Sequence, residues 1–433
     1  MSSKKYSNIN VWDATQERLK FIFDNFERVY VSFSGGKDSG VMLNAVIDYV
    51  RKNKINRKIG IQILDNEANY TMSLEFMHKI IQENRDVLDV YWCCLPINLP
   101  CTVSAYETDW QCWGVNDEHR WIRPMPDNDY IVNIHNHKFP FFKENMNYND
   151  FWDGFSEWYS QGKRTANLIG IRADESLNRF RAIANENKTM LKGRKWTKKN
   201  TKHSYNCYPI YDWRTNDVWV ANARFGWDYN RLYDLFYMAG IPVSRMRVAS
   251  PFMSESKSSL NMYRVIDPNV WQRLCARVMG ANFVATYGKQ IDYKSFNLPE
   301  GHTWRSFTKF LLATLPDATS KNYRQMFIKA IKYWGRVGKG LDDEMLADMK
   351  EKGIEFTTNG YSRHGRKDKL RCIMKSCPDH VDQLEKGHSD ILSWKRFAIV
   401  ILKNDHTGKY IGYMPPKEKL ERIKEIKAKY SKL

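Results

Sequence analysis

The feature that most constrains this chain is the segment RVYVSFSGGKDSGVMLNAVIDYV, from Arg28 to Val50. Its first residues form a short apolar run that is typical of a buried strand, and apolar residues recur at helical spacing from Val41 onward. The segment therefore predicts a strand, a tight turn and a helix. The turn holds two glycines, a lysine, an aspartate and two serines in the order SGGKDS, from Ser34 to Ser39.

The composition of this turn predicts an anion-binding site. Gly35 and Gly36 have no Cβ, so a ligand can approach the backbone, and the first amides of the following helix have no partner within the helix. Lys37 adds a positive charge. Asp38 would repel a phosphate unless a magnesium ion or a polarised water lies between them. A turn without a ligand is the alternative, and six consecutive residues of this chemistry argue against it.

The SGGKDS turn resembles the PP-loop signature of the ATP pyrophosphatase superfamily, whose members cleave ATP between the α and β phosphates. Two later segments resemble motifs of the branch that contains phosphoadenosine phosphosulfate (PAPS) reductase, the small subunit of ATP sulfurylase and the PP-loop protein of DNA phosphorothioation. They are LIGIRADESLNR, from Leu168 to Arg179, and YPIYDWRTNDVW, from Tyr208 to Trp219. Over its whole length the chain also resembles the IbrA-type proteins, which are described as coactivators of prophage gene expression.

This resemblance implies that ATP is bound with a magnesium ion and that pyrophosphate leaves when the bond between the α and β phosphates breaks. Lys37, Asp38 and Arg172 are then the candidate catalytic residues, and Asp38 is the candidate magnesium ligand. The candidate nucleotide-binding residues are Ser34, Gly35, Gly36, Lys37, Asp38, Ser39, Asp65, Arg172 and Arg179.

Several of these residues follow predicted strand ends. Asp65 ends the second strand, where a doubly wound sheet places ligand groups, and by resemblance it lies beside ribose or magnesium. Arg172, Arg179 and Arg181 follow a later strand and are expected to hold a phosphate or an acidic co-substrate, because a guanidinium pairs with phosphate through two hydrogen bonds. Asp174 and Glu175, which lie between Arg172 and Arg179, either cap the next helix or orient these arginines.

The chain departs from the assimilatory PAPS reductases at two places. Those enzymes have an altered phosphate loop and a C-terminal Glu-Cys-Gly-Leu-His-type motif with the catalytic cysteine, whereas this chain has a complete SGGKDS and lacks that motif. Ser244, Met246 and Ser250 stand where the reductases carry cysteines. We therefore expect ATP rather than PAPS as the substrate, without thiol-based reduction or an iron–sulfur cluster.

The eight cysteines show no disulfide framework, and reduced thiols are expected. Two groups of residues could hold a metal, although neither contains a C-x-x-C pair. They are Cys372, Cys377 and His380, and Cys112, His135 and His137.

The alternation of strands and helices predicts an α/β fold with a doubly wound, mainly parallel sheet. We predict a PP-loop domain over residues 1–260 and a basic, mostly helical domain over 261–433. Residues 95–162 form a Trp-rich insertion that either packs as a small core on the sheet or serves as a lid or base-stacking surface. Two short apolar runs, at 396–402 and 409–414, predict a hairpin.

The net charge of +19 is unevenly distributed. Residues 1–150 carry a net charge of −3, and residues 151–433 carry +22. This asymmetry predicts contact with DNA or RNA, with a solvated charged face as the alternative. Three basic clusters carry much of the excess, at 188–202, 363–375 and 417–432, and the first lies in a polar stretch that we expect to be a mobile loop.

No segment approaches the roughly 20 apolar residues of a membrane span, so we expect a cytoplasmic protein without membrane contact. A partner subunit is expected, because relatives often work with one. The leading hypothesis is an enzyme that releases pyrophosphate from ATP and forms an adenylylated product. The alternatives are a nucleotide-sensing regulator that acts by binding, and a sulfur-transfer enzyme that modifies DNA or tRNA, with Cys207 and Cys94 as its first candidate cysteines.

Overall fold

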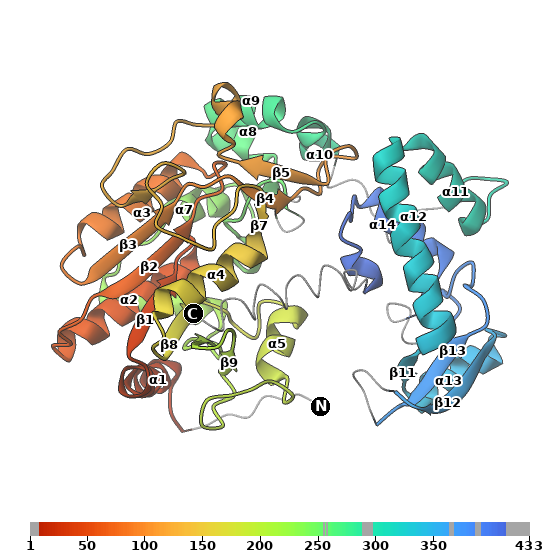
Figure 1. Cartoon of the computed structure of the whole chain (residues 1–433), viewed down its shortest axis with the longest axis horizontal. Helices are drawn as coiled ribbons and strands as arrows, with labels where there is room; N and C mark the ends of the chain where they lie inside the picture. The colour runs from red at the N-terminus through yellow and green to blue at the C-terminus, as the bar shows by residue number, and fades with distance from the viewer. Residues whose placement is uncertain are drawn as a thin grey trace.

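The computed structural model describes residues 8–253, 256, 259–287, 298–362, 368–385 and 391–412 (Figure 1). A seven-stranded sheet with the order β6-β3-β2-β1-β8-β10-β9 forms the centre of the first part of the chain. Its strands are β1 (Arg28–Ser32), β2 (Ile59–Leu64), β3 (Leu88–Cys93), β6 (Ile131–Val132), β8 (Thr165–Ile169), β9 (Thr197–Lys199) and β10 (Ser204–Cys207). All neighbouring pairs are parallel except β9 and β10.

Helices cover both faces of this sheet, which explains why its central strands are continuous apolar runs. Val29, Tyr30 and Val31 of β1 are at most 2% exposed. The principal covering helices are α1 (Val11–Asn25), α2 (Lys37–Lys52), α3 (Thr71–Gln82), α4 (Tyr148–Ser160) and α6 (Thr215–Phe225). The predicted doubly wound, mainly parallel α/β fold is confirmed.

The Trp-rich insertion builds a small second sheet from β4 (Ile97–Pro100), β5 (Asp109–Cys112) and β7 (Met146–Asn147). Trp110 and Trp113 are 5% and 1% exposed and belong to the same hydrophobic core as the central strands. These indoles therefore stabilise the insertion by burial and do not form an exposed stacking surface.

Three short helices follow the sheet and pack on its core: α8 (Met262–Ile266), α9 (Pro268–Arg277) and α10 (Ala281–Tyr287). A second core gathers residues between Leu312 and Ile411. A domain boundary drawn between these two cores lies after Tyr287, whereas the sequence predicts it after residue 260. The two-domain organisation itself remains a proposal. None of the helices in the described ranges is both long and apolar enough to cross a membrane.

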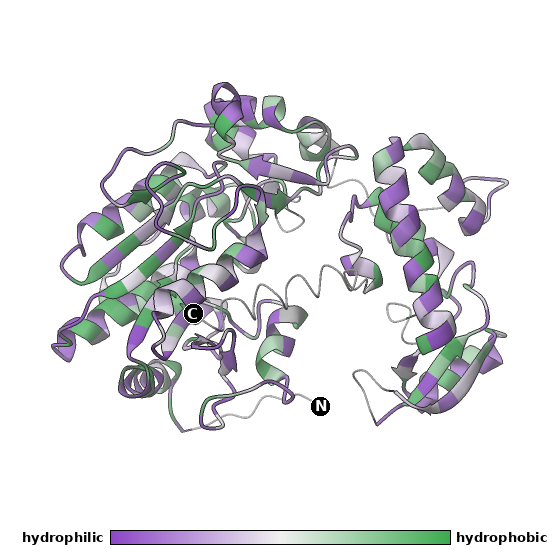
Figure 2. Ribbon diagram, viewed as in Figure 1, coloured by the Kyte–Doolittle hydropathy of each residue, from purple (hydrophilic) through white to green (hydrophobic). Residues whose placement is uncertain are grey.

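The second core combines four helices with an antiparallel sheet in the order β11-β13-β12 (Figure 1). Figure 2 shows hydrophobic and hydrophilic residues alternating along α12, as expected for a helix with one buried face. The elements are α11 (Trp304–Thr314), α12 (Asp317–Lys332), α13 (Asp343–Glu351), α14 (Trp394–Leu402), β11 (Lys339–Leu341), β12 (Phe356–Tyr361) and β13 (Leu370–Met374). The region was predicted to be mostly helical, and this is only partly confirmed, because it contains a three-stranded sheet as well as helices.

Two local predictions were wrong. The apolar run at 396–402 is part of α14 and not a strand, because a short apolar run suits a buried helix as well as a strand. Ser393 caps this helix by accepting a hydrogen bond from the Arg396 amide. The polar stretch around the basic cluster at 188–202, which was predicted to be a loop, contains β9, and β9 pairs with β10. Lys188 in this stretch donates to three main-chain carbonyls. The basic cluster at 417–432 and residues 363–367 of another cluster lie outside the described residues.

Candidate active site

The SGGKDS turn joins β1 to α2 at the point where the sheet order reverses, because β2 lies on one side of β1 and β8 lies on the other. Gly35 has a φ of +69°, and a Cβ at this position would lie 2.9 Å from the Met77 side chain. Both the backbone conformation and the packing therefore require glycine here. Gly36 is the N-cap residue and α2 begins with Lys37, so the positive end of this 16-residue helix lies within the SGGKDS segment.

The two serines hold the turn in shape. The amide and Oγ of Ser34 lie 3.3 and 3.0 Å from Ser39 Oγ, and Ser39 Oγ donates to the Gly36 carbonyl at 3.1 Å. Gly170, just after β8, lets a second strand end approach: a Cβ there would lie 3.0 Å from the Asp38 carbonyl and the Ser39 amide. The LIGIRADESLNR motif therefore approaches the PP-loop directly at Gly170.

The three candidate catalytic residues meet at one carboxylate. Arg172 Nε donates to Asp38 Oδ1 at 2.6 Å, and Lys37 Nζ donates to Asp38 Oδ2 at 3.1 Å. Arg172 Nη1 also donates to Asp174 Oδ1 at 2.6 Å. Lys37 and Arg172 are 5% and 1% exposed, so both cations are held in a largely desolvated position beside the helix N-terminus. Asp38 and Asp174 thereby orient the two cations.

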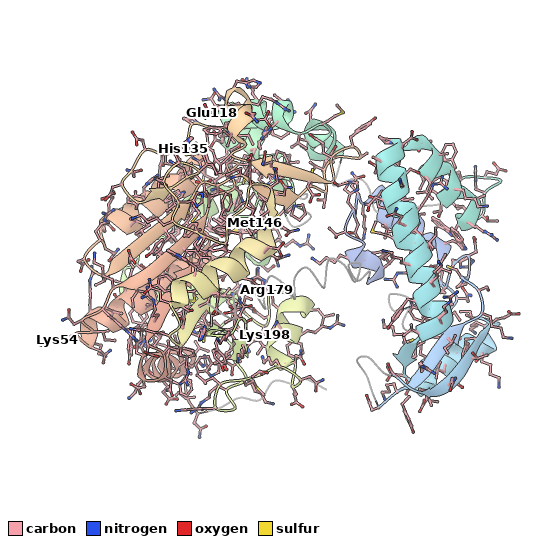
Figure 3. The ribbon with its side chains drawn as sticks, viewed as in Figure 1. Lys54, Glu118, His135, Met146, Arg179 and Lys198 are labelled. Carbon is pink, nitrogen blue, oxygen red and sulfur yellow. The ribbon has the colours of Figure 1, made fainter. Side chains whose placement is uncertain are left out.

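A second layer of charge comes from the start of α5 (Leu177–Ala184). Glu175 is paired with Arg179 and accepts from Arg247 Nη2 through its carbonyl at 3.0 Å. Burial raises the pKa of the Glu175 carboxyl, the Arg179 charge opposes this shift, and the Asp38 charge adds to it. Arg179, which is labelled in Figure 3, is therefore bound to Glu175, whereas Arg181 is exposed on α5.

Sequence reasoning missed the segment that covers the turn. Tyr233, in α7 (Leu232–Met238), accepts a hydrogen bond from the Lys37 amide at 3.0 Å, and Asn230 Nδ2 donates to the Gly35 carbonyl at 2.9 Å. The Met246 carbonyl accepts from Lys37 Nζ at 3.2 Å. Burial raises the pKa of the Tyr233 hydroxyl, which stays protonated. The sequence of this stretch shows only that the cysteines of the reductases are missing, and no local pattern marks these contacts.

Asp65 has a different role from the predicted one. It is fully buried, and its Oδ2 accepts from Trp92 Nε1 at 2.6 Å and from Arg123 Nη2 at 2.5 Å, while Oδ1 accepts from the Glu67 amide at 2.8 Å. Protein donors therefore occupy both oxygens. The carboxylate ties β2 to β3 and to the insertion, and it is not presented to ribose or magnesium.

Comparison with known proteins assigns the family. Residues 121–239 match the phosphoadenosine phosphosulfate reductase domain, and residues 240–422 match a domain of unknown function, DUF3440. The uncharacterized protein YbdN of Escherichia coli (strain K12) is 32% identical over 418 residues, which cover 95% of this chain and 92% of YbdN. The chain belongs to the PAPS reductase-like family of PP-loop proteins. The predicted superfamily is thereby confirmed, and the likeness to IbrA-type proteins remains a prediction.

Two solved structures are among the similar ones. The PAPS reductase of Candida auris, in a phosphate complex, is 12% identical, with 57% of this chain and 98% of that chain covered and a TM-score of 0.27. The U34-tRNA thiolase NcsA of Methanococcus maripaludis is 12% identical, with 67% and 81% covered and a TM-score of 0.29. The family assignment therefore rests on the sequence matches.

In this PAPS reductase-like protein, the carboxylates beside the PP-loop are paired with cationic side chains. Both oxygens of Asp38 accept from cationic side chains, and Asp174 and Glu175 are each paired with an arginine. Within the described ranges, no group of three or more His, Cys, Asp and Glu residues could hold a metal ion. The two Cys and His groups considered from the sequence therefore do not form such a cluster, and the role of Asp38 as a magnesium ligand remains a prediction.

The cysteines named for sulfur transfer are also unsuited to that chemistry. Cys94 and Cys207 are both 0% exposed, and burial raises the pKa of each thiol above its ordinary value. A thiol that stays protonated and enclosed cannot act as a nucleophile in the folded protein. The PAPS reductase-like site therefore offers cations and main-chain amides, and its described part offers no reactive cysteine.

Proposed function

We propose that this protein binds ATP at the PP-loop, cleaves it between the α and β phosphates and transfers the adenylyl group to an acceptor. The observation that carries the proposal is the convergence of Lys37 and Arg172 on Asp38 at the N-terminus of α2. A triphosphate needs this combination of positive charge and main-chain donors. The family assignment supports a nucleotide ligand.

The chemistry follows from the direction of charge movement. As an acceptor oxygen attacks the α phosphorus, negative charge gathers on the departing pyrophosphate. The first amides of α2 and the Lys37 ammonium stabilise that charge, and the desolvated position of Lys37 strengthens the interaction. Arg172 is held in one orientation by Asp38 and Asp174, so it can meet a phosphate oxygen without reorganising. No carboxylate is required as a metal ligand in this account.

The full chain, incubated with α-labelled ATP and magnesium, tests the proposal. Pyrophosphate and an AMP-type product should appear, with or without added nucleic acid and partner proteins from the native host. Lys37→Ala should abolish both products. The matched control is Arg85→Gln, which breaks an exposed ion pair with Asp129 far along the sequence from the PP-loop and should leave turnover unchanged.

The same assay separates the alternatives. ATP binding that depends on Lys37, without pyrophosphate release under any of these conditions, would contradict the enzymatic proposal and favour a nucleotide-sensing regulator. A shift in the mass of nucleosides from expressing cells would favour sulfur transfer. The buried state of Cys94 and Cys207 argues against the sulfur-transfer alternative.

A further inference from the structure

The segment that leads from the PP-loop to one edge of the central sheet carries charge of almost a single sign. Residues 177–202, which contain α5 and β9, hold nine Lys and Arg residues and one acidic residue, Glu186. α5 begins shortly after Arg172, so the segment starts beside the PP-loop. β9 ends the strand order of the sheet, and no described strand pairs with its outer edge.

A buried lysine holds α5 and the start of β9 together. Lys188 is 8% exposed, and its Nζ donates to the Ala182 and Ile183 carbonyls of α5 at 2.9 and 2.7 Å. It also donates to the Lys195 carbonyl, just before β9, at 2.5 Å. Burial lowers the pKa of Lys188, and the nearby charges of Lys198 and Lys195 lower it further. The cations of α5 and β9 therefore belong to one continuous surface.

Most of the exposed cations on this surface have no acidic partner. Arg181 of α5 and Lys198 and Lys199 of β9 are exposed, and none of them forms an ion pair with a described residue. Lys195 pairs with Glu186 at 3.2 Å, but a solvent-exposed pair of this kind contributes little. Cations gathered without carboxylates repel one another, so a polyanion that neutralises them binds favourably.

α5 exposes apolar side chains beside these cations. Leu177 and Phe180 are 61% and 42% exposed, and the exposed Ala184 follows them at helical spacing. Phe180 directly precedes Arg181 in the chain. An exposed ring among cations offers a stacking surface to an unpaired base, while the cations contact the phosphates that join successive bases. A duplex cannot use the ring in this way, because its bases are already stacked and paired.

We propose that α5 and β9 form a binding surface for single-stranded nucleic acid, in which Phe180 stacks on an unpaired base. Arg181, Lys198 and Lys199 contact the phosphate backbone. The complementary charge favours a nucleic acid over a protein partner. A strand on this surface lies next to the nucleotide site, because α5 starts beside the PP-loop. Binding of the strand requires neither ATP nor its cleavage, so the inference does not depend on the proposed enzymatic activity.

Fluorescence anisotropy of the full chain without ATP tests the surface. The probes are a labelled single strand of mixed sequence, as DNA and as RNA, and the DNA strand annealed to its complement. Arg181→Gln combined with Lys198→Gln should weaken single-strand binding about tenfold, and each lost phosphate contact should reduce the slope of log affinity against log salt by about 0.7. The matched control is Lys52→Gln combined with Lys54→Gln, which makes the same charge change at the end of α2 away from the PP-loop; Lys54 is labelled in Figure 3.

Phe180→Ala separates stacking from charge. The variant should bind the single strands about fivefold more weakly or worse, since stacking on one base contributes at least that much, and its affinity for the duplex should be unchanged. Tyr106→Ala is the matched control, because it removes a ring that is 60% exposed in the insertion.

Three results would overturn the proposal. The wild-type protein might bind neither single strand at low salt, which would leave the surface as a solvated or protein-docking face; the two charge-neutralised variants might behave alike; or Phe180→Ala might affect single strand and duplex equally. Binding of the DNA strand alone or of the RNA strand alone identifies the sugar that the surface accepts. Pyrophosphate release from ATP, measured on the same variants without nucleic acid, reports on the PP-loop separately.

Discussion

Arg172 Nε donates a hydrogen bond to Asp38 Oδ1 at 2.6 Å across 134 residues of sequence. Arg172 follows β8 and Asp38 lies in the first turn of α2, so the bond joins the ends of two neighbouring parallel strands. The Asp38 carboxylate accepts from Lys37 on its other oxygen. Asp38 is therefore the group that fixes the distance between the two cations proposed to hold the triphosphate.

Asp38→Asn should lower pyrophosphate release at least a hundredfold. The amide keeps the shape of the side chain but no longer neutralises two largely buried cations, and removal of one partner from a buried pair costs about 3–5 kcal/mol. Steady-state turnover and urea unfolding of the same protein measure the two effects. Asp129→Asn, in the exposed pair with Arg85, should alter neither quantity. Wild-type turnover by Asp38→Asn would exclude the proposed role.

Tyr233→Phe should destabilise the nucleotide-free protein by about 1 kcal/mol, the usual net contribution of one hydrogen bond. The substitution leaves the Lys37 amide without its acceptor. A phosphate oxygen can replace the tyrosine hydroxyl, so the affinity for ATP should stay equal or rise. Urea unfolding with and without ATP measures both quantities, and a marked loss of ATP affinity would mean that the hydroxyl contacts the nucleotide itself.

Gly170→Ala should abolish turnover although it adds one methyl group. Its Cβ would lie 3.0 Å from main-chain atoms of Asp38 and Ser39, which cannot move without displacing the PP-loop. Gly40→Ala, within α2, is the matched control: its Cβ would lie 3.5 Å from the Phe76 ring, and alanine favours the helix by roughly 0.5–1 kcal/mol. Turnover and melting temperature of the pair give the comparison. Equal activity of the two variants would show that the close approach of β8 is unimportant.

The buried thiols predict a loss of stability at high pH. Burial raises the pKa of Cys207 above its ordinary value of 9.0, so the folded protein keeps a proton that the unfolded chain loses. The stabilisation is complete below about pH 9 and falls by about 1.4 kcal/mol per pH unit above it. Cys207→Ala should therefore lose less stability between pH 8 and 10 than the wild type does, as measured by urea unfolding.

The same burial predicts that Cys94 and Cys207 do not react with a thiol reagent in the native state and do so after unfolding. Cys275 and Cys377 are partly exposed and serve as internal references. Rapid modification of Cys207 in the native protein, with loss of pyrophosphate release, would reopen the sulfur-transfer alternative.

Lys198→Glu combined with Lys199→Glu should weaken binding to duplex DNA if the basic later region contacts nucleic acid. Both lysines are exposed on β9, an edge strand at which lysines also prevent unwanted strand pairing, and Lys198 is labelled in Figure 3. Each lost phosphate contact should reduce the slope of log affinity against log salt by about 0.9. Fluorescence anisotropy at several salt concentrations measures this slope. ATP turnover without DNA should be unchanged, and a flat salt dependence in the wild type would exclude the contact.

The site was only partly predictable. SGGKDS marked the turn and its ligand class, since glycine conformation and helix-terminus chemistry act over a few residues. The parallel sheet was predicted, but the pairing of Arg172 with Asp38 was not, because Asp38 was expected to hold magnesium and Arg172 a phosphate. Tyr233 and Asn230 were missed because their contacts depend on how the chain after α6 returns over the turn. Asp65 was assigned to the ligand from its place at the end of the second strand. Its donor Arg123 was missed because it lies in the insertion, whose path no local pattern specifies.

The sequence by itself determined the order of strands and helices around the PP-loop, because buried strands and amphipathic helices follow from local apolar spacing. The run at 396–402 was predicted as a strand and forms part of α14, since a short apolar run satisfies both patterns. Only the tertiary structure decided which polar groups are partners: Asp65 with Arg123, Tyr233 with the Lys37 amide, and Asp267 with Thr71. Such pairs join segments far apart in the chain, and their geometry is set by the packing of the whole core rather than by the residues beside them.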